Sequence, residues 1–457
     1  AIIGLTMNAE RRAAPVPDLS LADYAAGLRN RTFSAEATVH RLLERIGDDA
    51  ALDAYTHVDA EGALAAARAA DANVVARNDA NPLLGVPIAL KDLYAATGLP
   101  MTAGSRVDIA DRIPAEGSLV RALKGAGAVI LGKTRTTEFA FGTYNPSHPT
   151  PRNPCDRAVH RMPGGSSSGS AVAMAAGLCA IAFGTDTGGS VRQPAALCGV
   201  VGFKATAGRL PMDGVFPLSP TFDSPGWFAP RIADIAVVWQ VLAGAPVGRA
   251  RPLDTLVVGR PDAHFFDGLD NDVVRAVDVA QARLIDAGVR IVSVTLPPLG
   301  DLDVAFGAFL SAELVATLGR ERVIATLSQM DPVVAARIAP GLELAADAYL
   351  TLRARFAMLA RDAHDAIGGV DVLLTPTCPR TAAPVAGHAD PALAAGWSRE
   401  TLRFTRPGNL FGLCGVSLPI GHLAGARPVG LQLLARGGDD AALLGIAAAI
   451  ETLLVRA

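Results

Sequence analysis

Three polar residues in glycine-rich or apolar surroundings could together perform acyl transfer. Lys91 closes the apolar run GVPIALKD, Ser166 lies in the turn GGSSSGS, and Ser190 lies in the turn GTDTGGSVR. A serine hydroxyl is a poor nucleophile at neutral pH and needs a base within hydrogen-bond reach. Burial at the end of a strand would disfavour the ammonium form of Lys91 and lower its pKa toward that of a general base. The pattern therefore predicts attack by Ser190, with neutral Lys91 as the base.

The second turn also offers a place for a negatively charged intermediate. It follows the apolar run LCAIAFGTD, and its glycines at 188 and 189 let consecutive backbone N–H groups converge on one point. This geometry suits an oxyanion hole beside Ser190. A helix that begins at GGSSSGS directs its N–H groups and positive dipole end toward the first turn. Asp186 and Arg192 flank the second turn, and we interpret them as structural residues that bond the backbone or each other.

Other chemistries fit the pattern less well. None of the eight histidines lies in a glycine-rich strand end, and Cys179 and Cys198 stand among apolar residues, which is typical of core thiols. GGSSSGS lacks the lysine of a phosphate-binding GxxxxGK[ST] loop, and no GxGxxG motif follows a strand. A glycine-serine loop alone is often only a turn, and a lysine after a strand is often paired, here with Asp92. The combination carries the prediction, and it requires no cofactor and no metal.

The surrounding elements alternate as a layered α/β fold requires. Short apolar runs closed by Gly, Pro or Asp indicate buried strands, and alanine-rich stretches between them indicate helices. Ser34 can cap a helix that presents Val39, Leu42, Leu43 and Ile46 on one face. We predict a single large α/β domain with a mixed, mostly parallel twisted sheet covered by helices on both faces. Predicted helices include residues 118–124, 168–176 and 441–454.

The chain shows no internal repeat and no low-complexity linker. We expect an N-terminal extension at residues 1–19 and one domain at 20–457. Within the domain, the expected catalytic core covers about residues 80–230 and 366–457. Residues 231–365 begin with a βα pair, continue in long helical segments, and are expected to cover this core.

Composition limits the partners. The 457 residues are half hydrophobic, and 41 basic and 44 acidic residues give a net charge of -3, which provides no reason to expect nucleic acid or an anionic membrane. The five cysteines show no CxxC spacing, and the longest apolar run, residues 171–183, is shorter than a membrane span. The apolar stretch at the start is too short for a signal peptide. We expect a cytoplasmic protein that acts on a small molecule. If the protein assembles, a homodimer is the form that we expect.

The motifs GVPIALKD, GGSSSGSAVAMAAG and GTDTGGSVRQPAALCGVVGFKAT together resemble the amidase signature family, and the similarity covers most of residues 20–454. Lys91, Ser166 and Ser190 stand 75 and then 24 residues apart, as in this family. The resemblance implies a Ser-Ser-Lys triad in which Ser166 relays a proton from Ser190 to Lys91 and an acyl-enzyme forms on Ser190. It also implies a cis Gly165–Ser166 peptide bond, structural support from Gly165 and Ser167, and an oxyanion hole built from the backbone N–H groups of Thr187, Gly188, Gly189 and Ser190.

One position departs from the commonest family form. Ser168 replaces a glycine after the relay serine, where it can cap the following helix.

The substrate is the part that the family does not fix. Glutaminase subunits of tRNA-dependent amidotransferases carry an arginine and an aspartate where this chain aligns Phe356 and Leu402. This difference favours a free-standing hydrolase of a small apolar or aryl amide. A small shift of the alignment would instead place an arginine at these positions, and the alternatives are a glutaminase subunit and a catalytically silent binding subunit. The arginines near these positions are Arg353, Arg355, Arg403 and Arg406. The residues predicted to line the substrate pocket are Tyr144, Phe139, Phe216 and Phe356.

Overall fold

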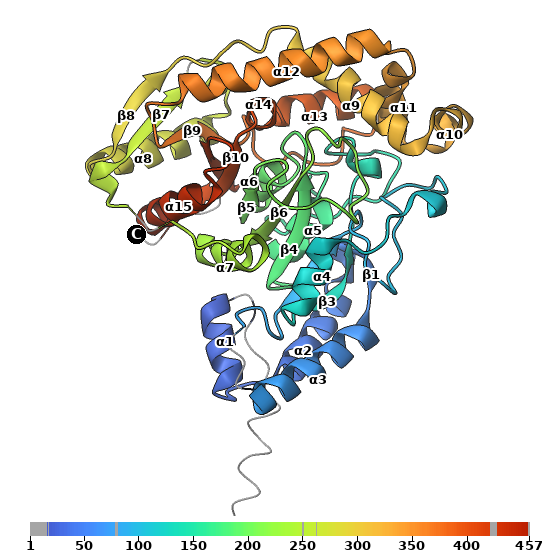
Figure 1. The fold of residues 1–457 in the computed structure, drawn as a ribbon, viewed down its shortest axis with the longest axis vertical. Coiled ribbons are helices and arrows are strands. Elements are labelled where there is room, and N and C mark those ends of the chain that lie inside the picture. Colours follow the sequence, from blue (N-terminus) through green and yellow to red (C-terminus); the bar gives the residue numbers. More distant parts are fainter. Residues whose placement is uncertain are drawn as a thin grey trace, which may run out of the picture.

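The apolar runs of the sequence form one mixed sheet in the computed structural model (Figure 1). The structure describes residue 16 and residues 18–77, 81–248, 251–261, 263–420 and 427–455. In these ranges the sheet order is β1-β3-β2-β4-β6-β5-β10-β11-β9-β7-β8. The strands are β1 (Tyr55–Val58), β2 (Pro87–Lys91), β3 (Val129–Thr134), β4 (Ile181–Asp186), β5 (Val201–Lys204), β6 (Ser224–Ala229), β7 (Val257–Pro261), β8 (Arg290–Val294), β9 (Val372–Pro376), β10 (Cys414–Ile420) and β11 (Val429–Ala435).

Strand direction differs from the prediction. Strand β2 pairs in parallel with β3 and β4, and β7 pairs in parallel with β8 and β9. The other six pairings of the described strands are antiparallel. The mixed sheet is therefore confirmed, but the expectation that it is mostly parallel is wrong. One reason lies between β5 and β6, where no α-helix intervenes to carry the chain back for a parallel pairing.

Helices cover both faces of this sheet. Helices α5 and α6 contact each other and the central strands, whereas α7, α8 and α15 form a second contacting group that packs on β6, β10 and β11. In Figure 1, α9 to α13 gather at the top of the molecule and α1 to α3 at the bottom. The helices are α1 (Leu21–Arg29), α2 (Ala35–Asp48), α3 (Ala60–Arg77), α4 (Ser118–Gly125), α5 (Ser168–Ala175), α6 (Arg192–Cys198), α7 (Ile232–Ala243), α8 (Asn271–Asp286), α9 (Leu302–Leu318), α10 (Arg320–Thr326), α11 (Pro332–Ile338), α12 (Ala346–Ala366), α13 (Pro391–Thr401), α14 (Arg406–Leu410) and α15 (Asp440–Val455).

Local sequence explains several of these helices. The hydroxyl of Ser34 accepts a hydrogen bond from the N–H of Ala37 at 3.1 Å and caps α2, as predicted. Val39, Leu42 and Ile46 of α2 are buried on its inner face. The apolar run at residues 171–183 is core, because it supplies buried residues to α5 and β4. The predicted helices at 118–124, 168–176 and 441–454 are confirmed as α4, α5 and α15.

The structure adds detail to the expected domain division. Strands β7 and β8, which belong to the proposed cover at residues 231–365, extend the same sheet as the catalytic strands. Most of the predicted extension at residues 1–19 lies outside the described residues. Within the described ranges no single helix is long and apolar enough to cross a membrane, although α9 and the segment Arg320–Gln329, bent by 99°, pass that test together.

Candidate active site

Two neighbouring parallel strands bring the lysine and the second turn to one edge of the sheet. Strand β2 ends at Lys91, and β4, which pairs with it in parallel, ends at Asp186. The carboxyl ends of parallel strands lie at the same edge of a sheet. The turn that contains Ser190 therefore begins beside Lys91.

The Lys91 side chain is fully buried among hydroxyl groups. Its Nζ atom donates to Ser166 Oγ at 2.7 Å and to Thr185 Oγ1 at 2.8 Å. Burial lowers the pKa of Lys91 to about 7, although the carboxylates of Asp223 and Asp186 act in the opposite direction. A large share of this lysine is therefore neutral near pH 7 and can accept a proton.

A salt bridge between Lys91 and Asp92 is the structural alternative raised by the sequence. Asp92 instead pairs with the buried Lys133, whose Nζ lies 2.9 Å from Asp92 Oδ1. Among the described residues, none of the ion pairs involves Lys91.

The first turn is anchored by its backbone on three sides. The Gly165–Ser166 peptide bond is cis, as expected. The N–H of Gly165 donates to Gln193 Oε1 at 2.9 Å, and the carbonyl of Ser166 accepts from the N–H of Thr137 at 3.1 Å. The N–H of Ser167 donates to the carbonyl of Ser190 at 3.3 Å, so the two serine turns are in direct contact.

The expected capping role of Ser168 is wrong. Helix α5 begins at Ser168, its N-cap is Ser167, and no side chain makes a capping hydrogen bond there. The hydroxyl of Ser168 is directed instead toward the carbonyl of Arg135, at 3.5 Å. The serine is therefore the first residue of the helix, one position past the cap.

The second turn differs from the predicted oxyanion hole at one of its four backbone N–H groups. The N–H of Gly189 donates to Asp186 Oδ1 at 2.9 Å, so this group is already used inside the protein. Gly189 has φ +127°, and a Cβ there would collide with the side chain of Thr405. Within the described chain no hydrogen-bond acceptor is recorded for the N–H groups of Thr187, Gly188 and Ser190. These three remain available to an oxyanion.

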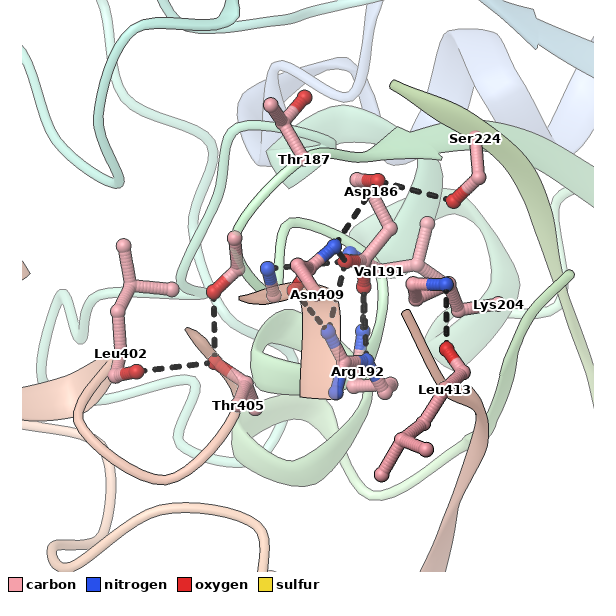
Figure 2. Close-up of polar contacts among 12 residues, drawn as sticks. Asp186, Thr187, Val191, Arg192, Lys204, Ser224, Leu402, Thr405, Asn409 and Leu413 are labelled. Carbon is pink, nitrogen blue, oxygen red and sulfur yellow. Dashed lines mark hydrogen bonds and ion pairs between the residues drawn. The ribbon is translucent and has the colours of Figure 1, made fainter. Parts of the chain in front are cut away.

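A buried ionic network supports the turn from below (Figure 2). Arg192 Nη2 lies 2.8 Å from Asp186 Oδ1, and both side chains are fully buried. Burial alone would raise the pKa of Asp186, but Arg192 outweighs it and holds the pKa well below its usual range. Arg192 also donates to Asn409 Oδ1 at 2.5 Å and to Gln432 Oε1 at 2.8 Å. The turn is thus fixed by residues from α14 and β11.

A second carboxylate near the site was not found from the sequence. Asp223 Oδ1 accepts a hydrogen bond from Thr187 Oγ1 at 2.5 Å, and Asp223 Oδ2 accepts from the N–H groups of Leu218 and Ser219, each at 3.0 Å. Burial raises the pKa of Asp223 to about 6, while these hydrogen bonds and Lys91 oppose the shift. Its sequence context, an aspartate in a loop before a strand, carries no signal of such a role.

The predicted aromatic pocket residues take different positions. Phe139 and Phe216 are fully buried and stack with ring centroids 5.8 Å apart, so they are core residues and offer no surface to a substrate. Phe356 packs edge-on against Phe222, with centroids 5.4 Å apart, in a cluster that includes Phe306. Tyr144, which is 5% exposed, lines a small hollow with Thr137, Thr143 and Ser168.

Two apolar side chains do reach the second turn. The ring of Phe306 lies 3.4 Å from where a Cβ on Gly188 would stand, and the side chain of Leu402 lies 3.0 Å from where a Cβ on Gly189 would stand. Phe306 was not predicted, because its contact with the turn joins residues more than a hundred positions apart.

The four arginines that lie near Phe356 and Leu402 in the sequence have different surroundings. Arg353 is exposed, Arg355 pairs with Asp301 at 2.6 Å, and the guanidinium of Arg403 lies 4.7 Å from the Phe404 ring centroid. Arg406 alone among the four adjoins the turn, through the ring of Phe306.

Among the described residues, no group of three or more His, Cys, Asp or Glu side chains is arranged to hold a metal ion.

Comparison with known proteins agrees with this geometry. A model of the family described as Amidase matches residues 37–444. The chain belongs to the amidase family. This amidase is 37% identical over 445 residues to the 2-amino-5-chloromuconic acid deaminase of Comamonas testosteroni, and the match covers 95% of this chain and 96% of the relative. It is 36% identical over 471 residues to a glutamyl-tRNA(Gln) amidotransferase subunit of Chromohalobacter salexigens, with 94% and 95% covered. A crystal structure of an amidase matches with a TM-score of 0.86 at 29% identity, over 95% of this chain and all of that one.

These similarities confirm the predicted family, fold and reaction class. The amidase is an enzyme of the amidohydrolase type that acts on C–N bonds. The interpretation as a silent binding subunit is not supported.

Proposed function

We propose that this enzyme hydrolyses a small carboxylic amide through an acyl-enzyme on Ser190. As Ser190 Oγ bonds to the carbonyl carbon, its proton passes to Ser166 Oγ, and the Ser166 proton passes to Lys91 Nζ. The N–H groups of Thr187, Gly188 and Ser190 hold the resulting oxyanion. When the C–N bond breaks, Lys91 returns a proton through Ser166 to the leaving nitrogen. Water then attacks the ester by the same route and releases the acid.

One observation carries this proposal. Lys91 is fully buried, has no acidic partner among the residues that the structure describes, and donates to Ser166 Oγ at 2.7 Å, beside the turn that holds Ser190. A buried lysine with a purely structural role is best placed next to a carboxylate, as Lys133 is next to Asp92. Placing Lys91 among hydroxyls favours its neutral form, which is the form a base requires.

The proposed substrate is small and presents an apolar part to the turn. Phe306 and Leu402 line that approach, in agreement with the apolar or aryl amide expected from the sequence. The relative from Comamonas testosteroni acts, by its name, on 2-amino-5-chloromuconic acid. A substrate of similar size is compatible with both observations.

The test combines labelling with kinetics. A fluorophosphonate probe should label Ser190, as mapped by mass spectrometry, and ammonia release should be measured over aryl, aliphatic and urea-type amides. Ser190→Ala should abolish both signals while the protein stays folded. Labelling at another residue, with activity retained in Ser190→Ala, would contradict the proposal.

A glutaminase role in a larger complex is the second candidate, favoured by the 36% identity to the glutamyl-tRNA(Gln) amidotransferase relative. This role requires partner subunits. Ammonia release from glutamine that rises when amidotransferase partner subunits are added would support it, whereas hydrolysis of other amides by the isolated chain would favour the first proposal.

We also propose a cytoplasmic location. The five cysteines are free in the structure, and four of them are buried, which suits a reducing compartment. Cell fractionation with an antibody against the chain would test this location.

A further inference from the structure

Arg337, on α11, carries a guanidinium that the proposed reaction does not use. The side chain is half-buried, and its Nη1 donates to the carbonyl of Phe141 at 3.1 Å. Arg337 takes part in none of the ion pairs recorded among the described residues, in contrast to Arg406, which pairs with Asp303. A guanidinium has five N–H donors in a planar fork. Among the described residues, the carbonyl of Phe141 is the acceptor recorded for this side chain, so its other donors can bind a ligand.

Short contacts connect Arg337 to the first serine turn. Gly142 lies against its guanidinium, since a Cβ there would stand within 2.5 Å of Arg337 Nη1. The carbonyl of Gly142 accepts from Thr137 Oγ1 at 2.9 Å, and the N–H of Thr137 donates to the carbonyl of Ser166 at 3.1 Å. The next residue after Gly142 also abuts the turn, since its carbonyl lies 2.7 Å from where a Cβ on Gly165 would stand. Arg337 is thus one loop away from the relay serine.

A second guanidinium lies on the side of the other turn. Arg406 Nη1 pairs with Asp303 Oδ1 at 2.8 Å, and its Cζ lies 5.8 Å from the ring centroid of Phe306. The ring of Phe306 adjoins Gly188. Each of the two turns is therefore connected to an arginine, the first to Arg337 through Gly142 and the second to Arg406 through Phe306.

Two further arginines and one carboxylate act on Arg337, and one of these arginines, Arg406, is itself paired with Asp303. Burial lowers the pKa of Arg337 to about 10, Arg406 and Arg399 act in the same direction, and only Asp331 acts against them. The carboxylate of Asp331 is occupied by other donors, because it accepts from the hydroxyl and the N–H of Ser147, at 2.7 and 2.9 Å, and from the N–H of Val333, at 2.9 Å. A negatively charged ligand would relieve the mutual repulsion of the arginines.

We propose that Arg337, with Arg406 beside it, binds a free carboxylate of the substrate, so that the enzyme acts on amides that also carry a carboxylate, such as monoamides of dicarboxylic acids. The inference rests on the proposed function, because it places the reacting acyl group between Ser166 and the turn at 187–190. Phe306 and Leu402 contact the apolar middle of such a substrate, and the guanidinium holds its charged end. The apolar expectation then describes only one part of the molecule.

The test compares each acid monoamide with its uncharged diamide. The series runs from malonamate to adipamate, with the matching diamides, and kcat/KM is measured by ammonia release. A hydrogen-bonded charge of this kind corresponds to about 10- to 150-fold in rate or affinity, so the wild type should prefer one monoamide by at least about tenfold. Arg337→Gln should lose that preference while diamide hydrolysis changes less than about threefold. Arg337→Lys should restore part of the preference, and Arg355→Gln, a surface control, should retain all of it.

Binding gives a readout that does not depend on turnover. Ser190→Ala should bind the preferred monoamide by calorimetry, and the double variant with Arg337→Gln should not. A Ser190→Ala protein that binds no monoamide of the series overturns the inference, and so does an Arg337→Gln variant that slows monoamide and diamide equally, which is the result for a purely structural arginine. Full activity of Ser190→Ala on both amides would instead refute the proposed function, while its binding preference would still report on Arg337.

Discussion

The pH dependence of turnover follows from the burial of Lys91. If its neutral form is the base, kcat/KM rises with pH as the lysine loses its proton. With a pKa of about 7 the neutral fraction increases about 50-fold from pH 5 to pH 7 and only about twofold from pH 7 to pH 9. The acid limb should therefore be steep and the neutral region nearly flat, when ammonia release from one amide is measured across this range.

Substitution of Asp223 should shift the acid limb of this pH–rate profile. Its negative charge favours the ammonium form of Lys91, so Asp223→Asn should lower the pKa of Lys91 and shift the limb to lower pH. The pKa of Asp223 itself is raised to about 6, so the wild-type limb reports the coupled pair. The exposed Asp213 gives a matched control, because Asp213→Asn should leave the profile unchanged. A wild-type rate that is flat from pH 5 to pH 7, or an Asp223→Asn limb displaced to higher pH, would refute the reasoning.

Four further outcomes are expected. Ser190→Ala should reduce kcat by at least about 10³-fold with an unchanged circular dichroism spectrum, and a variant retaining several per cent of the wild-type rate would exclude Ser190 as the nucleophile. Arg192→Ala should lower the free energy of unfolding in urea by about 3–5 kcal/mol, because Asp186 is left as a buried unpaired charge. The control Arg121→Ala, which breaks an exposed ion pair, should lower it by less than about 1 kcal/mol. Equal losses in the two variants would contradict a stabilising role of the buried network. Gly189→Ala should reduce activity strongly, since the new Cβ collides with Thr405, whereas Gly98→Ala, also at positive φ but in open space, should lose only about 1 kcal/mol of stability and keep its activity. EDTA should not change the rate, and a loss of activity that zinc restores would mean that the proposed triad chemistry is wrong.

Elements whose sequence signal is local could be predicted. The ends of β2 and β4 and the start of α5 are marked by apolar runs that stop at polar or glycine residues, and these ends hold Lys91, Ser166 and the second turn. Helix α2 could be placed because its cap and its buried face lie within one short segment.

The features that were missed depend on contacts across long separations. Asn409 and Gln432 each bond Arg192 from more than 200 positions away, and an isolated amide residue gives no sign of such a partner. The strand directions were missed because apolar runs record burial but not orientation. Phe139 and Phe216 were misassigned because aromatic composition does not distinguish a core stack from a pocket wall.

The network around Arg192 has a consequence during synthesis. All three residues of the proposed triad are translated before residue 200, but the side chains that satisfy the Arg192 guanidinium come from positions 409 and 432. A nascent chain that still lacks those positions has a complete set of reactive groups and an unsupported turn. We therefore expect that a fragment ending before residue 409 is inactive, because Arg192 would lack the acceptors that Asn409 and Gln432 provide.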